Sequence, residues 1–154
     1  MEIYFDNSAT TGLCREAADA VAAINRDIYG NPSSLHAAGI AAERALRDSR
    51  NTVLSFLAAP REDTLVFCGS GSEANNLALL GCARAKNFRG TPTVVTDDSE
   101  HPSVSEAVCQ LEREGFRVIK IPTHGGALDK GALDAAADSG VVLASFMRVN
   151  NETG

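Results

Sequence analysis

The chain has 154 residues, 44% of them hydrophobic and 22% charged, which is ordinary for one globular domain. Its formal net charge of −6 argues against nucleic acid or an anionic membrane as a partner, because both require a basic face. No apolar run approaches the roughly 20 residues of a membrane helix, and no basic segment followed by an apolar stretch begins the chain, so we expect a cytoplasmic protein.

The first 60 or so residues predict an extended segment followed by two helices. Residues 3–5 form the extended segment, and residues 6–11 that follow are dense in small polar side chains. Apolar residues at helical spacing predict a helix over 15–29 and a longer one over 35–58. Ser33 or Ser34 is expected to cap the second helix, because both follow a turn that contains Pro32.

From residue 64 onward, strand and helix patterns alternate. Strands are predicted over residues 64–67, 92–96, 116–121 and 141–146, and helices over residues 72–86, 103–113 and 129–137. The middle helix begins with the capping-box pattern SVSE at Ser103 and ends at Gly115, while Asp129 caps the last helix. Such repeated β-α-β units predict a largely parallel sheet with helices on its faces.

Three segments fall at the carboxyl ends of predicted strands, where α/β sheets bind ligands. Residues 67–73, FCGSGSE, combine glycines, serine hydroxyls and a helix start, so they could hold a phosphate or simply form the capping box SGSE. His101 could act as an acid/base or stack on a flat ligand, or be an ordinary loop histidine. Asn150 and Asn151 could donate to a ligand oxygen or form a turn.

Taken together and in this order, the segments resemble those of the cysteine desulfurase family. The resemblance is carried by residues 4–11 (YFDNSATT), 30–36 (GNPSSLH), 67–76 (FCGSGSEANN), 100–104 (EHPSV), 110–116 (QLEREGF) and 149–154 (VNNETG). The phosphate-loop segment departs from the family pattern, because CGSGS at residues 68–72 stands where the family has Thr-Ser-Gly-Ala-Thr.

The resemblance implies the large domain of a fold-type-I enzyme that depends on pyridoxal 5'-phosphate (PLP). The expected fold is α/β, a three-layer PLP-dependent transferase domain whose mostly parallel sheet has helices on both faces, here incomplete. Residues 1–12 would pack with a small domain, and residues 13–154 would form the first part of the large domain. The implied reaction converts L-cysteine to L-alanine and passes sulfur to an enzyme cysteine as a persulfide, for iron-sulfur cluster assembly or another sulfur-transfer pathway.

The resemblance also implies roles for residues of this chain. Gly71 and Ser72 would bind the PLP phosphate, His101 would stack on the pyridine ring and assist proton transfer, and Asn151 would contact the phenolic oxygen. The substrate end of the site would be formed by Asn7, Ala9 and Thr10. The family resemblance further implies a homodimer and a sulfur-acceptor or scaffold protein as partner.

The family's PLP-binding lysine, its pyridine-pairing aspartate and its nucleophilic cysteine are expected beyond residue 154. The lysines of this chain (Lys86, Lys120 and Lys130) do not stand in the family's Ser-x-His-Lys context, so we expect the 154 residues alone to be inactive. The cysteine spacings fit no zinc pattern, and no metal site is predicted. Two alternatives stay open: another class V aminotransferase-type enzyme, such as a selenocysteine lyase, and a catalytically inactive scaffold or dimerisation fragment.

Overall fold

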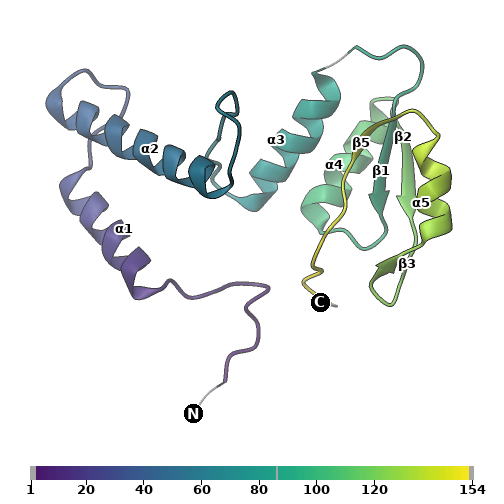
Figure 1. Ribbon diagram of the computed structural model, residues 1–154, viewed down its shortest axis with the longest axis horizontal. Helices are drawn as coiled ribbons and strands as arrows, with labels where there is room; N and C mark the ends of the chain where they lie inside the picture. Colours follow the sequence, from purple (N-terminus) through teal and green to yellow (C-terminus); the bar gives the residue numbers. More distant parts are fainter. Residues whose placement is uncertain (1–2, 86, 153–154) are drawn as a thin grey trace. The chain divides into compact units, whose positions relative to one another are not determined.

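The computed structural model describes residues 3–85 and 87–152 and divides into two compact units, Met1–Val66 and Phe67–Gly154 (Figure 1). Within the described ranges, no helix is both long enough and apolar enough to cross a membrane. The predicted division of the chain at residue 12 concerns packing against a further domain, and it stays a prediction.

The first unit contains two helices, α1 (Arg15–Asp27) and α2 (Ala37–Phe56), which confirm the two helices predicted there. Each ends two residues before its predicted end. Apolar side chains of the last turn of α1 and of the middle of α2 surround a hollow of about 260 Å³. It is lined by Ile24, Ile28, Pro32, Ala42, Ala45, Leu46 and Ser49.

The predicted serine caps of α2 are wrong, because His36 is the N-cap and its Nδ1 accepts from the backbone N–H of Gly39. Ser33 and Ser34 belong to the preceding turn instead. The N–H of Ser33 donates to Asn31 Oδ1, and that of Ser34 donates to the Asn31 carbonyl, each at 2.9 Å. The asparagine therefore organises this turn, and the helix begins only after it.

The strand predicted over residues 64–67 is also wrong, since these residues form no ladder with any strand in the described ranges. The carbonyl of Leu65 instead accepts from Arg50 Nε of α2 at 2.9 Å. An apolar run becomes a strand only where a neighbouring strand pairs with its peptide groups. That pairing is a tertiary property, and the local pattern does not contain it.

The second unit is built on a parallel sheet of three strands in the order β2-β1-β5. Its strands are β1 (Thr93–Asp97), β2 (Arg117–Ile121) and β5 (Val141–Ala144), at the places that the sequence predicts. The helices are α3 (Gly71–Arg84), α4 (Pro102–Arg113) and α5 (Lys130–Ala137). The predicted end of the first of these, at Lys86, lies outside the described residues.

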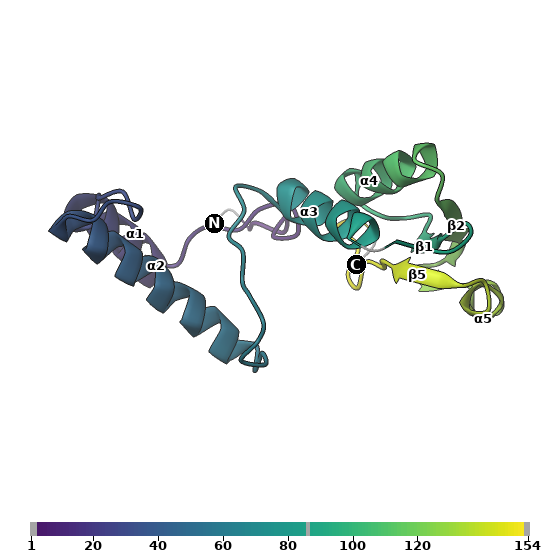
Figure 2. The ribbon, with the colours of Figure 1, turned by 90° about the horizontal axis from the view of Figure 1, so that it is seen from above.

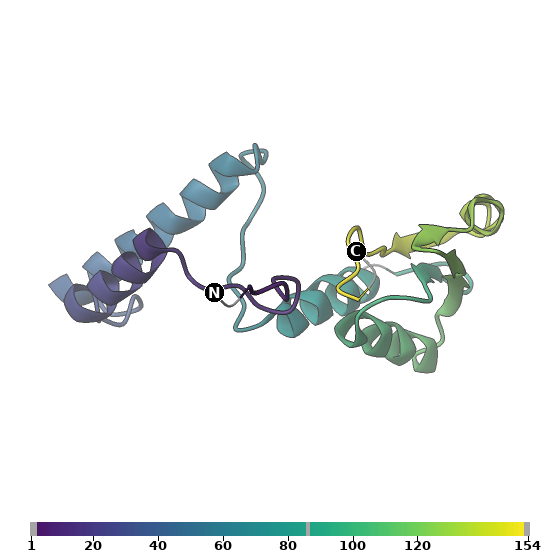
Figure 3. The same cartoon turned by 90° about the horizontal axis from the view of Figure 1, so that it is seen from below.

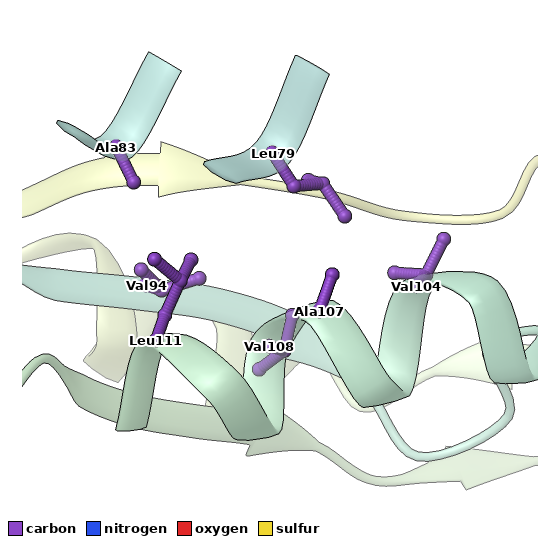
Figure 4. Packing of buried hydrophobic residues seen from close by; sticks show 7 residues of the cluster. All are labelled: Leu79, Ala83, Val94, Val104, Ala107, Val108 and Leu111. Atoms are coloured by element: carbon purple, nitrogen blue, oxygen red, sulfur yellow. The ribbon is translucent and has the colours of Figure 1, made fainter. Parts of the chain in front are cut away.

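The helices cover opposite faces of this sheet, because successive residues of the central strand point to opposite sides. Val94 packs among apolar residues of α3 and α4 (Figure 4), whereas Val95 packs in a second cluster with Ile121 and Ala136 of α5. Figures 2 and 3 show α4 and α5 on opposite sides of the strands. The α3–α4 side holds the larger cluster, in which Val94, Val108 and Leu111 are fully buried.

Two local details of the second unit differ from the sequence prediction. The helix α4 begins at Pro102, with His101 rather than Ser103 as its N-cap. An unpredicted hairpin joins β3 (Thr123–His124) to β4 (Ala127–Leu128) through two glycines with positive φ. Asp129 caps α5 and Gly115, at φ +95°, follows α4, both as predicted.

Candidate cofactor site

The start of α3 is a capping box, as one interpretation of the sequence predicts. Ser70 is the N-cap, and its Oγ accepts from the N–H of Glu73 at 3.1 Å. The Glu73 carboxylate turns back and accepts from the N–H of Gly69 at 2.6 Å. The negative charge is therefore bound to the loop that precedes the helix, at the end where the helix dipole favours it.

This capping box leaves donors for an anion at the same helix start. No acceptor in the described part of the chain receives a hydrogen bond from the backbone N–H of Gly71 or Ser72. A Cβ added at Gly71 meets no atom within 4 Å, so the space beside this residue is open. Unpaired amides at a helix start, with a serine hydroxyl beside them, are the donors that bind phosphates in proteins.

His101 stands at the start of the neighbouring helix α4, and its ring is held by two contacts with Ser103. The N–H of Ser103 donates to His101 Nδ1 at 3.1 Å, and Ser103 Oγ lies 2.8 Å from the same nitrogen. Asn75 of α3 donates through Nδ2 to this Oγ at 2.8 Å. Since Asn75 follows Ser72 by about one helical turn, this bond brings the starts of α3 and α4 together.

The loop after β5 is attached to the same edge of the sheet. Asn150 donates through Nδ2 to the carbonyl of Ser99 at 2.9 Å and accepts from the N–H of Glu152 through Oδ1 at 2.8 Å. The exposed Asn151 and His101 then line one polar cavity of about 290 Å³. The full lining is Asp98, Ser99, Glu100, His101, Pro102, Asn150, Asn151 and Glu152.

The carboxyl group of Glu100, which lines this cavity, has a pKa shifted from its ordinary value. Burial, together with the neighbouring carboxylate of Asp97, raises the pKa of Glu100 against the opposing hydrogen bond from Ser145. Sequence reasoning did not single out Glu100 as a site residue, because a carboxylate shows its burial only in the fold. Among the described residues, no three side chains of His, Cys, Asp or Glu gather closely enough to hold a metal ion.

The residues predicted at the substrate end, Asn7, Ala9 and Thr10, lie in the first unit, in an exposed turn that follows the extended segment. The N–H groups of Ala9 and Thr10 both donate to the carbonyl of Asp6 at 3.2 Å. The hydroxyl of Tyr4 donates to the carbonyls of Asp6 and Thr10, each at 3.0 Å. These polar groups thus form an ordered turn, and their predicted contact with substrate stays a prediction.

In a comparison with known proteins, the family described as Aminotransferase class-V matches residues 3–154. The chain belongs to that family. It is 40% identical over 153 residues to a "NifS/IcsS protein homolog" of Lactobacillus delbrueckii subsp. bulgaricus, covering 99% of this chain and 39% of the relative. It is also 40% identical over 154 residues to a "Cysteine desulfurase" of Cereibacter sphaeroides, with the same coverage.

Among solved structures, a "NIFS-like protein" matches with a TM-score of 0.88 and 30% identity, over 98% of this chain and 41% of that one. The resemblance to cysteine desulfurases and the α/β fold of class V aminotransferase-type proteins are thereby confirmed. The chain spans about 39% of the length of the curated relatives it matches.

The site residues that the structure brings together are those of the second unit: Gly71 and Ser72 at the start of α3, and His101 and Asn151 at the cavity beside α4. Sequence reasoning missed the Asn75–Ser103 pair behind them, because this hydrogen bond joins two separate helices. Asn150, considered as a ligand donor, instead donates to the Ser99 carbonyl.

Proposed function

We propose that this chain supplies the cofactor-binding part of a PLP-dependent cysteine desulfurase. The observation that carries this proposal is the juxtaposition of two helix starts by the Asn75–Ser103 hydrogen bond. One helix start offers unpaired amides suited to a phosphate, and the other offers an exposed imidazole suited to an aromatic ring. The name of the Cereibacter sphaeroides relative, "Cysteine desulfurase", supports the same assignment.

The residues present fit the parts of PLP. The amides of Gly71 and Ser72, with the Ser72 hydroxyl, would donate to the phosphate, whose approach the open space at Gly71 permits. His101 would stack on the pyridine ring, and the Asn151 amide would donate to the phenolic oxygen. When bound, PLP draws electrons away from the substrate carbon.

In the overall reaction, the carbon–sulfur bond of L-cysteine breaks, and sulfur joins an enzyme cysteine as a persulfide while L-alanine leaves. Asn7, Ala9 and Thr10 would hold the substrate end of the site. We also propose that the lysine that binds PLP and the cysteine that receives sulfur come from residues outside these 154. A homodimer and a sulfur-acceptor or scaffold protein complete the proposed assembly.

The proposal is tested on the protein at its natural full length, by PLP titration and by alanine release from L-cysteine with a reductant present. Substituting Ser72→Ala removes one hydrogen bond to a charged group and is expected to weaken PLP binding roughly ten- to hundred-fold. The matched control is Ser105→Ala in α4, because the Ser105 hydroxyl donates to the Pro102 carbonyl of its own helix and to no other group among the described residues.

Failure of the wild-type protein to bind PLP would contradict the cofactor assignment. Alanine released from selenocysteine but not from cysteine would instead favour a selenocysteine lyase. PLP binding without alanine release from either substrate would favour an inactive scaffold.

A further inference from the structure

His101 is joined to the second turn of α3 by a chain of two side-chain contacts that no single motif contains. Asn75 Nδ2 lies 2.8 Å from Ser103 Oγ, which lies 2.8 Å from His101 Nδ1. Asn75 and Ser103 are both partly buried, whereas the imidazole itself is exposed. The contacts therefore position the histidine from its protein side and leave its outer side accessible.

The backbone determines the direction of these hydrogen bonds. The N–H of Ser103 points at His101 Nδ1 from 3.1 Å, and a peptide N–H can only donate. His101 Nδ1 must therefore be an unprotonated acceptor. It follows that the Ser103 hydroxyl donates its proton to Nδ1 and accepts from Asn75, so that the neutral ring carries its proton on Nε2.

We propose that Ser103 and Asn75 are positioning residues that hold His101 as a neutral Nε2–H hydrogen-bond donor. The unprotonated nitrogen of this tautomer is Nδ1, and it already accepts the hydrogen bond from the Ser103 N–H that caps α4. His101 consequently presents a ring face and the Nε2–H group to its ligand. This orientation suits His101 to stacking on a flat ligand and to donating a hydrogen bond through Nε2.

The inference rests on the proposed function for the identity of the ligand, but the tautomer is a property of the chain itself. It is tested without cofactor or substrate, by nitrogen NMR of the full chain labelled with ¹⁵N-histidine. Failure of the desulfurase assignment would therefore leave this result unchanged. Spectra are recorded at about pH 8.5, well above the ordinary histidine pKa of about 6.5, and His101 is assigned by its loss in His101→Gln.

The wild-type spectrum is expected to show His101 with a protonated Nε2 and an unprotonated, hydrogen-bonded Nδ1. In Ser103→Ala, the Nδ1 resonance should move toward that of a less strongly hydrogen-bonded nitrogen, and Ser103→Thr should restore it. Asn75→Leu should produce a smaller shift in the direction of Ser103→Ala. His36 is an internal reference, because its Nδ1 accepts from the backbone N–H of Gly39.

Ser105→Ala is the matched control, and it should leave the His101 resonances in place. A protonated Nδ1 in the wild-type protein would overturn the proposal, and so would an unchanged Nδ1 resonance in Ser103→Ala. An unchanged His101 Nδ1 resonance in Asn75→Leu would show that Asn75 is not a positioning residue. Equal shifts of His101 and His36 in Ser103→Ala would show general unfolding and would also overturn the positioning role.

Discussion

Replacing Gly39 by alanine tests the close packing of the turn against α2. A Cβ added at Gly39 would lie 2.2 Å from the carbonyl oxygen of Ser34 and 2.8 Å from that of Asn31. These are backbone atoms, and the turn is held by hydrogen bonds of Ser33 and Ser34 to Asn31. The turn cannot yield as a flexible side chain would, so the substitution must displace it or the first turn of α2.

The size of the effect follows from a comparison with Gly81 in α3, where an added Cβ meets no atom within 4 Å. Both glycines lie in helices, so alanine should gain about 0.5–1 kcal/mol of helix stability at either site. Only Gly39→Ala adds the cost of overpacking, typically about 1–3 kcal/mol. We expect Gly81→Ala to stabilise its helix. The change in helix stability caused by Gly39→Ala should be about 1–3 kcal/mol less favourable than the change caused by Gly81→Ala.

The assay is hydrogen exchange followed by mass spectrometry, because it reports on each helix separately. For each variant we compare the exchange rate of the substituted helix with that of the same helix in the wild type. A difference of about 1–3 kcal/mol in helix stability predicts that this ratio is roughly 5- to 150-fold higher for α2 of Gly39→Ala than for α3 of Gly81→Ala. Equal protection gains in the two variants would refute the packing argument, since they would show that the turn moves at no cost.

Three further substitutions have expected outcomes in denaturant unfolding. The hydrogen bond from Arg84 lowers the pKa of Glu114 from 4.5 to about 2, so its stabilising contribution is present above pH 4.5 and is lost as the pH falls toward 2. Glu114→Gln should flatten this acid dependence, and an unchanged slope would contradict the pairing. Burial and the carboxylate of Asp97 raise the pKa of Glu100, so stability should fall as the pH rises from the ordinary value through the raised one. Glu100→Gln should abolish that fall. If stability instead fell more steeply with pH in the variant than in the wild type, the fold would be lowering the pKa of Glu100, not raising it. Thr96 is buried, and its hydroxyl has no partner among the described residues. Thr96→Val should therefore stabilise by about 1 kcal/mol, whereas a loss of stability would reveal a partner for the hydroxyl.

The order of the elements after residue 70 could be predicted from the sequence because it depends on local periodicity. Each strand of the sheet and each helix between them carries its own apolar pattern. The glycine after α4 and the aspartate before α5 are equally local, since each serves the backbone of its own segment. The segments that carry the family resemblance are likewise short and continuous, which is why the α/β fold could be predicted before the structure.

The details that depend on distant partners were decided only by the tertiary structure. Residues 64–67 have the pattern of a strand but no paired neighbour in the described ranges, and Ser103 has the pattern of a cap but lies inside a helix capped by His101. The contact of Asn75 with Ser103 joins residues 28 positions apart. A periodic pattern states which side chains prefer burial, whereas hydrogen-bond partners are chosen by which segments the fold brings together. The residue types of the candidate site can therefore be predicted from the sequence, whereas the hydrogen bond from Asn75 to Ser103 depends on the packing of α3 against α4.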